Sequence, residues 1–437
     1  MKRISILACI LGVCFASTVW AQQPATKPPM GRHVPHRMTN QASRTPGVTV
    51  SRDFNAQANP DHKAKVWELG TWTGGTWLAV WHINDLGIIG ARGDVPDSDG
   101  VLSNHTLAVS LFGPHAGQWA DLGALGGAQD TGWEEAYGDI SNTGLVVDRS
   151  NAQDGQEHAV AWTKETGLVD LGTLADTGDP RYASFNASIA PGTNKLGTLI
   201  VGRSLIGEHY QSGPPVVWTP SREWEKGQFV TKWNIHKLPT NGFPGVVGFI
   251  AWGVNDYGQI IGTGFNDDFS VMTAVLWNPR TDGKGWKIMA LPSSALPSSQ
   301  AYGINNRGEI VGVSNSADQS TFVAQLWKPT NKNRTTYSQP IELPLPEGGF
   351  TSCENVGINN LGDMVGDCWN DDYSLNLPVR WSTKHLTASE VLNFPAVWGF
   401  TWGVNDFRIA TVTYVSDLDG NCPYDTYGSC GGAIQLH

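Results

Sequence analysis

Acidic side chains gather in two short segments of this chain that match each other. The triplet Asn-Asp-Asp stands at 266–268 and again at 370–372, at corresponding positions of a longer repeat. Carboxylates suit a Ca²⁺ ion or the hydroxyl groups of a sugar. The alternative, which the sequence favours, is a solvated acidic surface whose residues cap tight turns. The candidate ligand-binding acids are Asp267, Asp268, Asp371 and Asp372.

A third acidic segment has the alternate spacing of the oxygen ligands in a calcium loop. Asp417, Asp419 and Asn421 are the candidate ligands, because alternate residues of a curling loop turn their oxygens inward. Cys422 stands where such a loop needs glycine, and no glutamate follows at the twelfth position. The pattern of a calcium loop is therefore incomplete, and Ca²⁺ is the one cofactor that the sequence suggests.

Three tryptophans, Trp77, Trp133 and Trp398, belong to the same predicted loop surface. An exposed indole can stack on a sugar ring or anchor a partner protein. Glu134 and Glu135 follow Trp133, and two carboxylates beside an aromatic platform can in principle hydrolyse a glycosidic bond. No catalytic residue is assigned, because the chain contains no nucleophile elbow, phosphate-binding glycine loop or zinc-like cluster of His and Cys.

The strands and loops that position these residues belong to a repeated sequence unit. A core of the form Ile-Asn-x-x-Gly-x-Ile-Val-Gly is strong at 83–90, 254–262, 304–312 and 358–366, and weaker copies occur at 141–144, 194–197 and 405–408. Asn at the first position and Gly at the fourth predict a tight turn between two strands. The copies lie 46 to 61 residues apart, which is the spacing of propeller or solenoid repeats.

Each repeat divides into four short strands, the third of which ends in tryptophan. These tryptophans recur once per repeat, so packing explains them better than ligand binding. They are Trp162, Trp218, Trp277, Trp327 and Trp381. A four-stranded unit cannot bury both of its faces alone, and radial packing of several such units solves this in a β-propeller. The tight turns would then lie on one face of the disc and the long loops, where function concentrates, on the other.

The ends of the chain predict how the ring closes. The seventh repeat ends after a third strand at 433–436, whereas 65–71 matches the fourth-strand phrase Asp-Leu-Gly-Thr-Leu and precedes the first complete repeat. We therefore predict an all-β fold over residues 63–437, a seven-bladed β-propeller of four-stranded antiparallel blades. Its N-terminal strand completes the last blade. An open solenoid is the alternative, but it would leave both end units uncapped.

The repeat resembles the HAF-repeat family of predicted extracellular proteins. Residues 158–162 and 170–174 carry its His-Ala-Phe-x-Trp and Asp-Leu-Gly-Thr-Leu phrases, and the four strong turns carry its core. The resemblance covers about residues 64–436. It departs at Thr273, Val323 and Pro378, which replace the histidine, and at Arg408, which replaces the turn glycine. The resemblance implies an exported, propeller-like repeat without an established activity, and no functional residue is taken from it.

The N-terminal region indicates export. Residues 1–21 have the basic start, apolar stretch and small-residue cleavage site of a signal peptide, and 22–62 are expected to form a disordered linker. Without Lys2 and Arg3 the net charge changes from -11 to -13, which disfavours nucleic acid and anionic membranes as partners. No later segment is apolar enough to span a membrane. We expect a secreted, periplasmic or cell-surface protein.

Four cysteines remain after the predicted leader, which suggests two disulfides in an exported chain. Cys353 and Cys368 flank a turn almost symmetrically, and Cys422 and Cys430 share one loop of the last repeat. The sequence thus favours an exported binding or scaffold module that recognises a glycan or an extracellular protein through an acidic, Trp-bearing long-loop face. The alternative is a carbohydrate-active hydrolase or lyase with acidic residues near the propeller axis.

Overall fold

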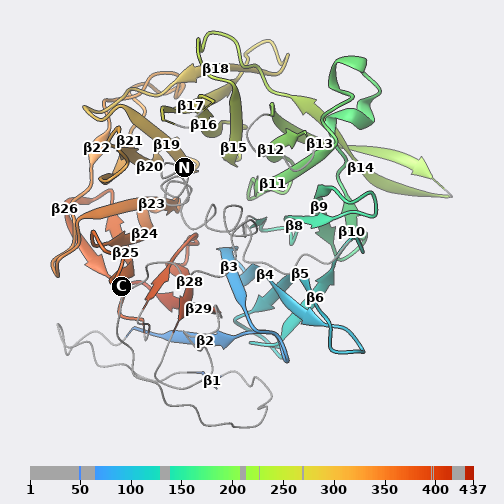
Figure 1. Cartoon of the computed structure of the whole chain (residues 1–437), viewed down its shortest axis with the longest axis horizontal. Coiled ribbons are helices and arrows are strands. Elements are labelled where there is room, and N and C mark those ends of the chain that lie inside the picture. Colours follow the sequence, from blue (N-terminus) through green and yellow to red (C-terminus); the bar gives the residue numbers. More distant parts are fainter. Residues whose placement is uncertain are drawn as a thin grey trace, which may run out of the picture.

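The computed structural model describes residues 49–50, 64–127, 138–206, 213–225, 227–267, 270–394, 396, 398–415 and 429–437. Seven antiparallel sheets stand around a common axis and form a disc (Figure 1). The seven-bladed propeller predicted from the repeat is confirmed. The signal peptide and nearly all of the predicted linker lie outside the described residues.

Each complete blade runs from an inner strand near the axis to an outer strand at the rim. Blade 1 consists of β3 (Leu78–Ile83), β4 (Ile88–Pro96), β5 (Leu102–Ser110) and β6 (Trp119–Gly123). Blade 2 consists of β7 (Asp139–Ile140), β8 (Val146–Asn151), β9 (Glu157–Thr163) and β10 (Gly167–Asp170). Blade 3 consists of β11 (Ala187–Thr193), β12 (Ile200–Leu205), β13 (Pro215–Glu225) and β14 (Gln228–Lys237). Two short 3-10 helices, η2 (Leu174–Thr177) and η3 (Pro180–Tyr182), link blades 2 and 3.

Blades 4 to 6 repeat the same order. Blade 4 consists of β15 (Gly248–Val254), β16 (Ile260–Phe265), β17 (Met272–Pro279) and β18 (Trp286–Ala290). Blade 5 consists of β19 (Ser298–Ile304), β20 (Ile310–Asn315), β21 (Phe322–Trp327) and β22 (Ile341–Glu342). Blade 6 consists of β23 (Ser352–Ile358), β24 (Asp363–Trp369), β25 (Asn376–Ser382) and β26 (His385–Val391).

Blade 7 closes the ring with strands from both ends of the chain. It contains β27 (Trp398–Phe400), β28 (Ile409–Val415), β29 (Cys430–Gln435), β2 (Val66–Gly70) and an additional outermost strand β1 (Thr49–Val50). Trp67 lies opposite Ala433 in the β2–β29 register, and Val66 lies opposite Ile434. The predicted closure by the N-terminal strand is therefore confirmed, and β1 is the described part of the segment predicted to be a linker.

The recurring tryptophans hold neighbouring blades together. The indole of Trp327 is fully buried, and its Nε1 donates a 2.8 Å hydrogen bond to the carbonyl of Pro292, which follows the outer strand of blade 4. Trp218, Trp277 and Trp381 make the equivalent bond to the preceding blade. The packing role predicted for these rings is confirmed for Trp218, Trp277, Trp327 and Trp381.

Replacing Trp327 by phenylalanine should lower the free energy of unfolding by about 2 kcal/mol, because the Pro292 carbonyl loses its donor and a small cavity remains. The measurement is urea unfolding followed by tryptophan fluorescence. Trp162→Phe is the matched control, since Trp162 occupies the same position on β9 of blade 2 and is only half-buried. Equal losses in the two variants would show that ring volume, and not the bond between blades, carries the effect.

Candidate functional site

The Asn-x-x-Gly turns meet around the axis on one face of the disc, which we call the tight-turn face. In the turn of blade 6, Asn359 Oδ1 accepts bonds from the backbone of Leu361 and Asp363 at 3.0 and 2.8 Å. Its Nδ2 donates a 2.9 Å bond to the carbonyl of Asn405 in blade 7. One side chain thus caps its own turn and joins the next blade.

The same bond to the next blade recurs at five of the seven junctions. Its donors are Asn84, Asn255, Asn305, Asn359 and Asn405, and the last donates to the carbonyl of Asn84 across the closure. All five are at least 97 % buried. Blade 2 has Ser141 at this position, and Asn194 of blade 3 bonds instead to Thr198 within its own turn. The asparagine of the Asn-x-x-Gly motif therefore joins neighbouring blades as well as forming the turn.

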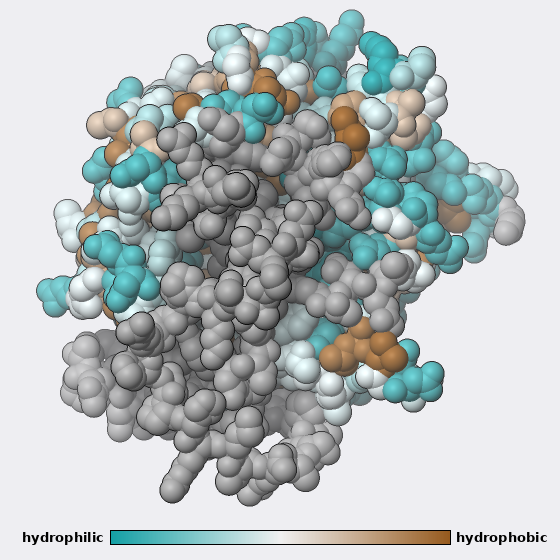
Figure 2. All heavy atoms as spheres, viewed as in Figure 1, coloured by the Kyte–Doolittle hydropathy of each residue, from teal (hydrophilic) through white to brown (hydrophobic). Residues whose placement is uncertain are grey.

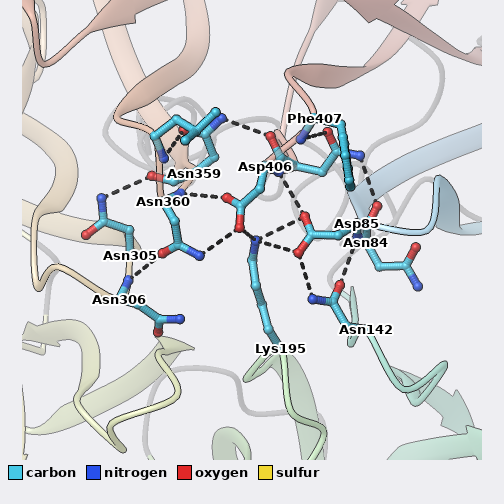
Figure 3. A network of polar contacts seen from close by, with 12 residues as sticks. Asn84, Asp85, Asn142, Lys195, Asn305, Asn306, Asn359, Asn360, Asp406 and Phe407 are labelled. Carbon is cyan, nitrogen blue, oxygen red and sulfur yellow. Dashed lines mark hydrogen bonds and ion pairs between the residues drawn. The ribbon is translucent and has the colours of Figure 1, made fainter.

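A second polar layer is formed by the residues that follow these asparagines. Asp85, Asn142, Lys195, Asp256, Asn306, Asn360 and Asp406 take part in bonds that close a circuit from blade to blade, several of them to the backbone of the next blade. The link from blade 3 to blade 4 is donated by the N–H of Leu196 to Asp256 Oδ1. In Figure 3 the Lys195 side chain extends into the middle of this network. Its Nζ lies 3.1 Å from Asp85 Oδ2 and 2.7 Å from Asp406 Oδ2, so that blade 3 is tied to blades 1 and 7.

This layer sets three aspartates, Asp85, Asp256 and Asp406, against the single lysine Lys195, so it is acidic, but its carboxylates accept hydrogen bonds from protein donors. Burial alone would raise the pKa of Asp406, but hydrogen bonds from Lys195 and Asn360 outweigh it and hold that pKa below its usual value. Asp85 and Asp256 likewise accept bonds from neighbouring turns. The layer is thus a rigid polar platform whose oxygens are already engaged by protein donors.

Apolar side chains surround this platform. The third residue of the Asn-x-x-Gly turn is apolar in five of the seven blades, and in each case it is well exposed. We call this set the apolar ring; it consists of Leu86 (62 % exposed), Leu196 (55 %), Tyr257 (58 %), Leu361 (40 %) and Phe407 (66 %). Their recurrence at one position on one face makes the apolar ring a candidate interaction surface, whereas scattered single residues would need no explanation.

The long-loop face differs from this arrangement. Asp267, Asp371 and Asp372 are exposed, and Asp372 Oδ1 accepts bonds from the backbone and hydroxyl of Ser374, at 3.1 and 2.6 Å. These bonds lower the pKa of Asp372 and make the triplet a capped turn. Among the described residues, no group of three His, Cys, Asp or Glu side chains could hold a metal ion.

The predicted tryptophan platform is only partly within the described chain. Trp77 is buried, with 6 % of its surface exposed, so its ring is not an open stacking surface. Trp398 is half-buried and packs edge-on against Phe400, with ring centroids 5.4 Å apart. Trp133, Asp268, Asp417, Asp419, Asn421 and Cys422 lie outside the described residues. Outside its grey atoms, the face seen in Figure 2 is mainly hydrophilic.

One predicted disulfide is confirmed. Cys353 and Cys368 lie directly opposite each other on β23 and β24 and are joined by a disulfide. Cys430 is also disulfide-bonded, and its pairing with Cys422 stays a prediction. A disulfide fits an extracellular protein. Within the described chain, no helix is long and apolar enough to cross a membrane.

Two buried carboxyl groups lie beside this disulfide. Glu354 and Asp367 are the next pair in the β23–β24 register, and they are 4 % and 5 % exposed. Burial raises the pKa of Asp367 to about 7, against the opposing effect of a hydrogen bond from Asn376. Burial, and then the charge of Asp367, raise the pKa of Glu354. This pair leaves no signal in the sequence, because cross-strand register and burial follow only from the assembled blade.

No family model matches the chain, and no curated protein is similar to it at a significant level. The HAF-repeat resemblance therefore stays a prediction. Among solved structures, the chain is similar to an acylaminoacyl peptidase of Pyrococcus horikoshii, with 9 % identity, a TM-score of 0.42 and coverage of 80 % of this chain and 51 % of that one.

Two other similar structures are glycan-related enzymes. A Trypanosoma rangeli sialidase in complex with 2,3-difluorosialic acid has 10 % identity and a TM-score of 0.35, over 90 % of this chain and 59 % of that one. Bacillus subtilis levansucrase has 8 % identity and a TM-score of 0.36, over 74 % and 88 %. The chain thus spans about half of the peptidase and three-fifths of the sialidase. At these scores the likeness carries no argument about activity, and the protein is identified by its fold alone, a seven-bladed β-propeller.

Proposed function

We propose that this protein is an exported binding or scaffold module and that its partner is another extracellular protein, held by the apolar ring on the tight-turn face. The observation that carries the proposal is the recurrence of an exposed apolar side chain at the same turn position in five blades. Leucine at three of these positions favours an apolar protein surface, because aliphatic side chains offer a sugar ring no stacking partner.

The polar platform supports this role by fixing the ring. Each apolar residue directly follows a residue of the polar platform, and in four of the five turns the asparagine bonds to the neighbouring blade and holds the turn in place. A preorganised apolar surface loses little conformational entropy when a partner docks, so more of the burial energy remains for affinity. The alternative predicted from the sequence, a hydrolase or lyase with axial acids, is less favoured, since Asp85, Asp256 and Asp406 are bonded to protein donors.

Site-specific photo-crosslinking tests the proposed surface. Leu86 or Phe407 is replaced by benzoylphenylalanine in the full chain, which is then irradiated on the cells that export it. We expect one discrete protein adduct from both positions. Val101 is the matched control, because it is an exposed apolar residue in the β4–β5 loop on the other face. Equal labelling from Val101, or no adduct from the ring, would overturn the proposal.

Charge substitutions then test the ring with the crosslinked partner. Leu361→Glu and Phe407→Glu should each weaken binding roughly tenfold, because losing an interface anchor costs about 1–2 kcal/mol. Thermal unfolding should be unchanged, since both side chains are already exposed. A glycan array run with and without Ca²⁺ covers the other predicted partner class. Glycan binding that is insensitive to both substitutions would replace the protein proposal with recognition on the long-loop face.

A further inference from the structure

The outer hairpin of blade 3 is longer than any other outer strand pair of the disc. Its strands β13 and β14 have 11 and 10 residues, whereas the outer strands of the other complete blades have 2 to 7. Figure 1 shows the hairpin projecting beyond the rim at the right. Residues 222–225 and 227–229 at the tip are exposed, so this part of the hairpin adds little to the closed core of the propeller.

One face of this hairpin is aromatic and uncovered. Trp224 lies opposite Phe229 in the register, their ring centroids are 4.8 Å apart, and they are 64 % and 65 % exposed. Trp233, on the same face, lies opposite Pro220 and packs against the hydrophobic core between blades 2 and 3. This face thus carries aromatic residues at its base and at its tip, with the pair Arg222 and Thr231 between them.

The backbone edge of β14 is also open. The N–H of Leu238 donates 2.9 Å to the carbonyl of Pro215, its register partner, so this pair is hydrogen-bonded. Bonded pairs alternate along an antiparallel ladder, and hence Phe229, Thr231 and Trp233 turn their N–H and C=O groups away from β13. In the described part of the chain, β14 is the last strand of its sheet and pairs only with β13. A long edge without proline is a template for strand addition.

We propose that β14 pairs with β14 of a second copy of this chain, antiparallel, about a two-fold axis at Thr231. In this register Phe229 of each copy faces Trp233 of the other, which is a favourable aromatic cross-strand pair. The pairing satisfies both open edges at once. In each copy, Lys232 Nζ lies 3.1 Å from Glu225 Oε1 of the same hairpin. This ion pair limits the repulsion between Lys232 of one copy and Lys232 of the other.

Neighbouring registers fit less well. An axis at Phe229 would align only the tips of the two hairpins. An axis at Trp233 would carry each tip against the body of the other disc, where Lys237 lies over the ring of Tyr182 at 5.7 Å. The register centred on Thr231 uses residues 228–234 of each copy and leaves the two discs on opposite sides. This inference does not depend on the apolar ring, so variants of the two surfaces can fail separately.

A cysteine scan tests the register in the mature full-length protein. Thr231→Cys places the two new thiols opposite each other, and mild oxidation should convert most of the protein into a covalent dimer on a non-reducing gel. Arg222→Cys is the control on the same face, because residue 222 lies opposite Thr231 on β13. In the proposed dimer the two copies of residue 222 are three strand spacings apart, about 14 Å, which is too far for a disulfide.

The edge itself is tested without a cross-link. Thr231→Pro removes an outward N–H and leaves the β13–β14 ladder intact, as proline is tolerated on such an edge. We expect the wild type to show a dimer by light scattering at about 100 μM and the proline variant to be monomeric. The melting curves of the two should agree at a protein concentration low enough for the wild type to be monomeric as well. A monomeric wild type, a proline variant that still dimerises, or cross-linking through residue 222 and not 231 would each overturn the proposal.

Discussion

Asn359→Ala is expected to lower the free energy of unfolding by about 3 kcal/mol, since it removes one bond between blades and two turn caps at a buried site. The carbonyl of Asn405 and the N–H groups of Leu361 and Asp363 would lose their partner where water has little access. Urea unfolding of the purified chain measures this loss of free energy. The slope of the free energy against denaturant concentration should be the same in the wild type and the variant.

The matched control is Asn194→Ala in blade 3. Asn194 Oδ1 caps its turn in the same way, by accepting from the backbone of Thr198 and Leu199, but its amide makes no bond to the next blade. We expect a loss of about 1 kcal/mol, the typical value of a capping side chain. The difference between the two variants measures the inter-blade bond. Equal losses of unfolding free energy in the two variants would mean that the cap of the turn, and not the bond between blades, accounts for the contribution of Asn359 to stability.

The fold was predictable because its signals are local. The Asn-x-x-Gly turn needs an asparagine cap and a positive φ at its last residue, and Gly258, Gly308 and Gly362 have φ values of 75°, 79° and 89°. Arg408 stands at the same position and also takes a left-handed φ of 61°. The four-strand pattern and the missing last strand then led to the closed ring, which needs no knowledge of side-chain contacts.

The candidate surfaces were less accessible to sequence reasoning. The donation from Asn359 to the carbonyl of Asn405 joins residues 46 positions apart, and only the rotation between blades brings them together. The apolar ring did leave a signal, because Leu86, Tyr257 and Phe407 occupy a turn position that normally carries polar residues. Tight turns indicate scaffold and long, variable loops indicate function, so sequence reasoning directs attention to the long-loop face and away from this recurrence.

The buried carboxyl pair predicts an unusual dependence of stability on pH. The pKa of Asp367 is displaced upward from 3.8 to about 7, so the folded protein holds a proton that the unfolded chain releases. Stability from this group is fully present below pH 4 and is lost as the pH rises through 7. The displacement corresponds to a loss on the order of 4 kcal/mol across that window.

Asp367→Asn should remove much of this loss, because asparagine keeps the size of the side chain and carries no charge at any pH. We therefore expect the variant to unfold at a higher denaturant concentration than the wild type at pH 8, and the difference between the two to shrink as the pH falls towards 4. Asp371→Asn is the control, since Asp371 is exposed in the following turn. Glu354→Gln should act in the same direction, because burial and the neighbouring Asp367 raise the pKa of Glu354 too. If the wild type and the Asp367 variant respond identically to pH, the pair is more solvated than its burial indicates, and the strands beside the disulfide must open to water.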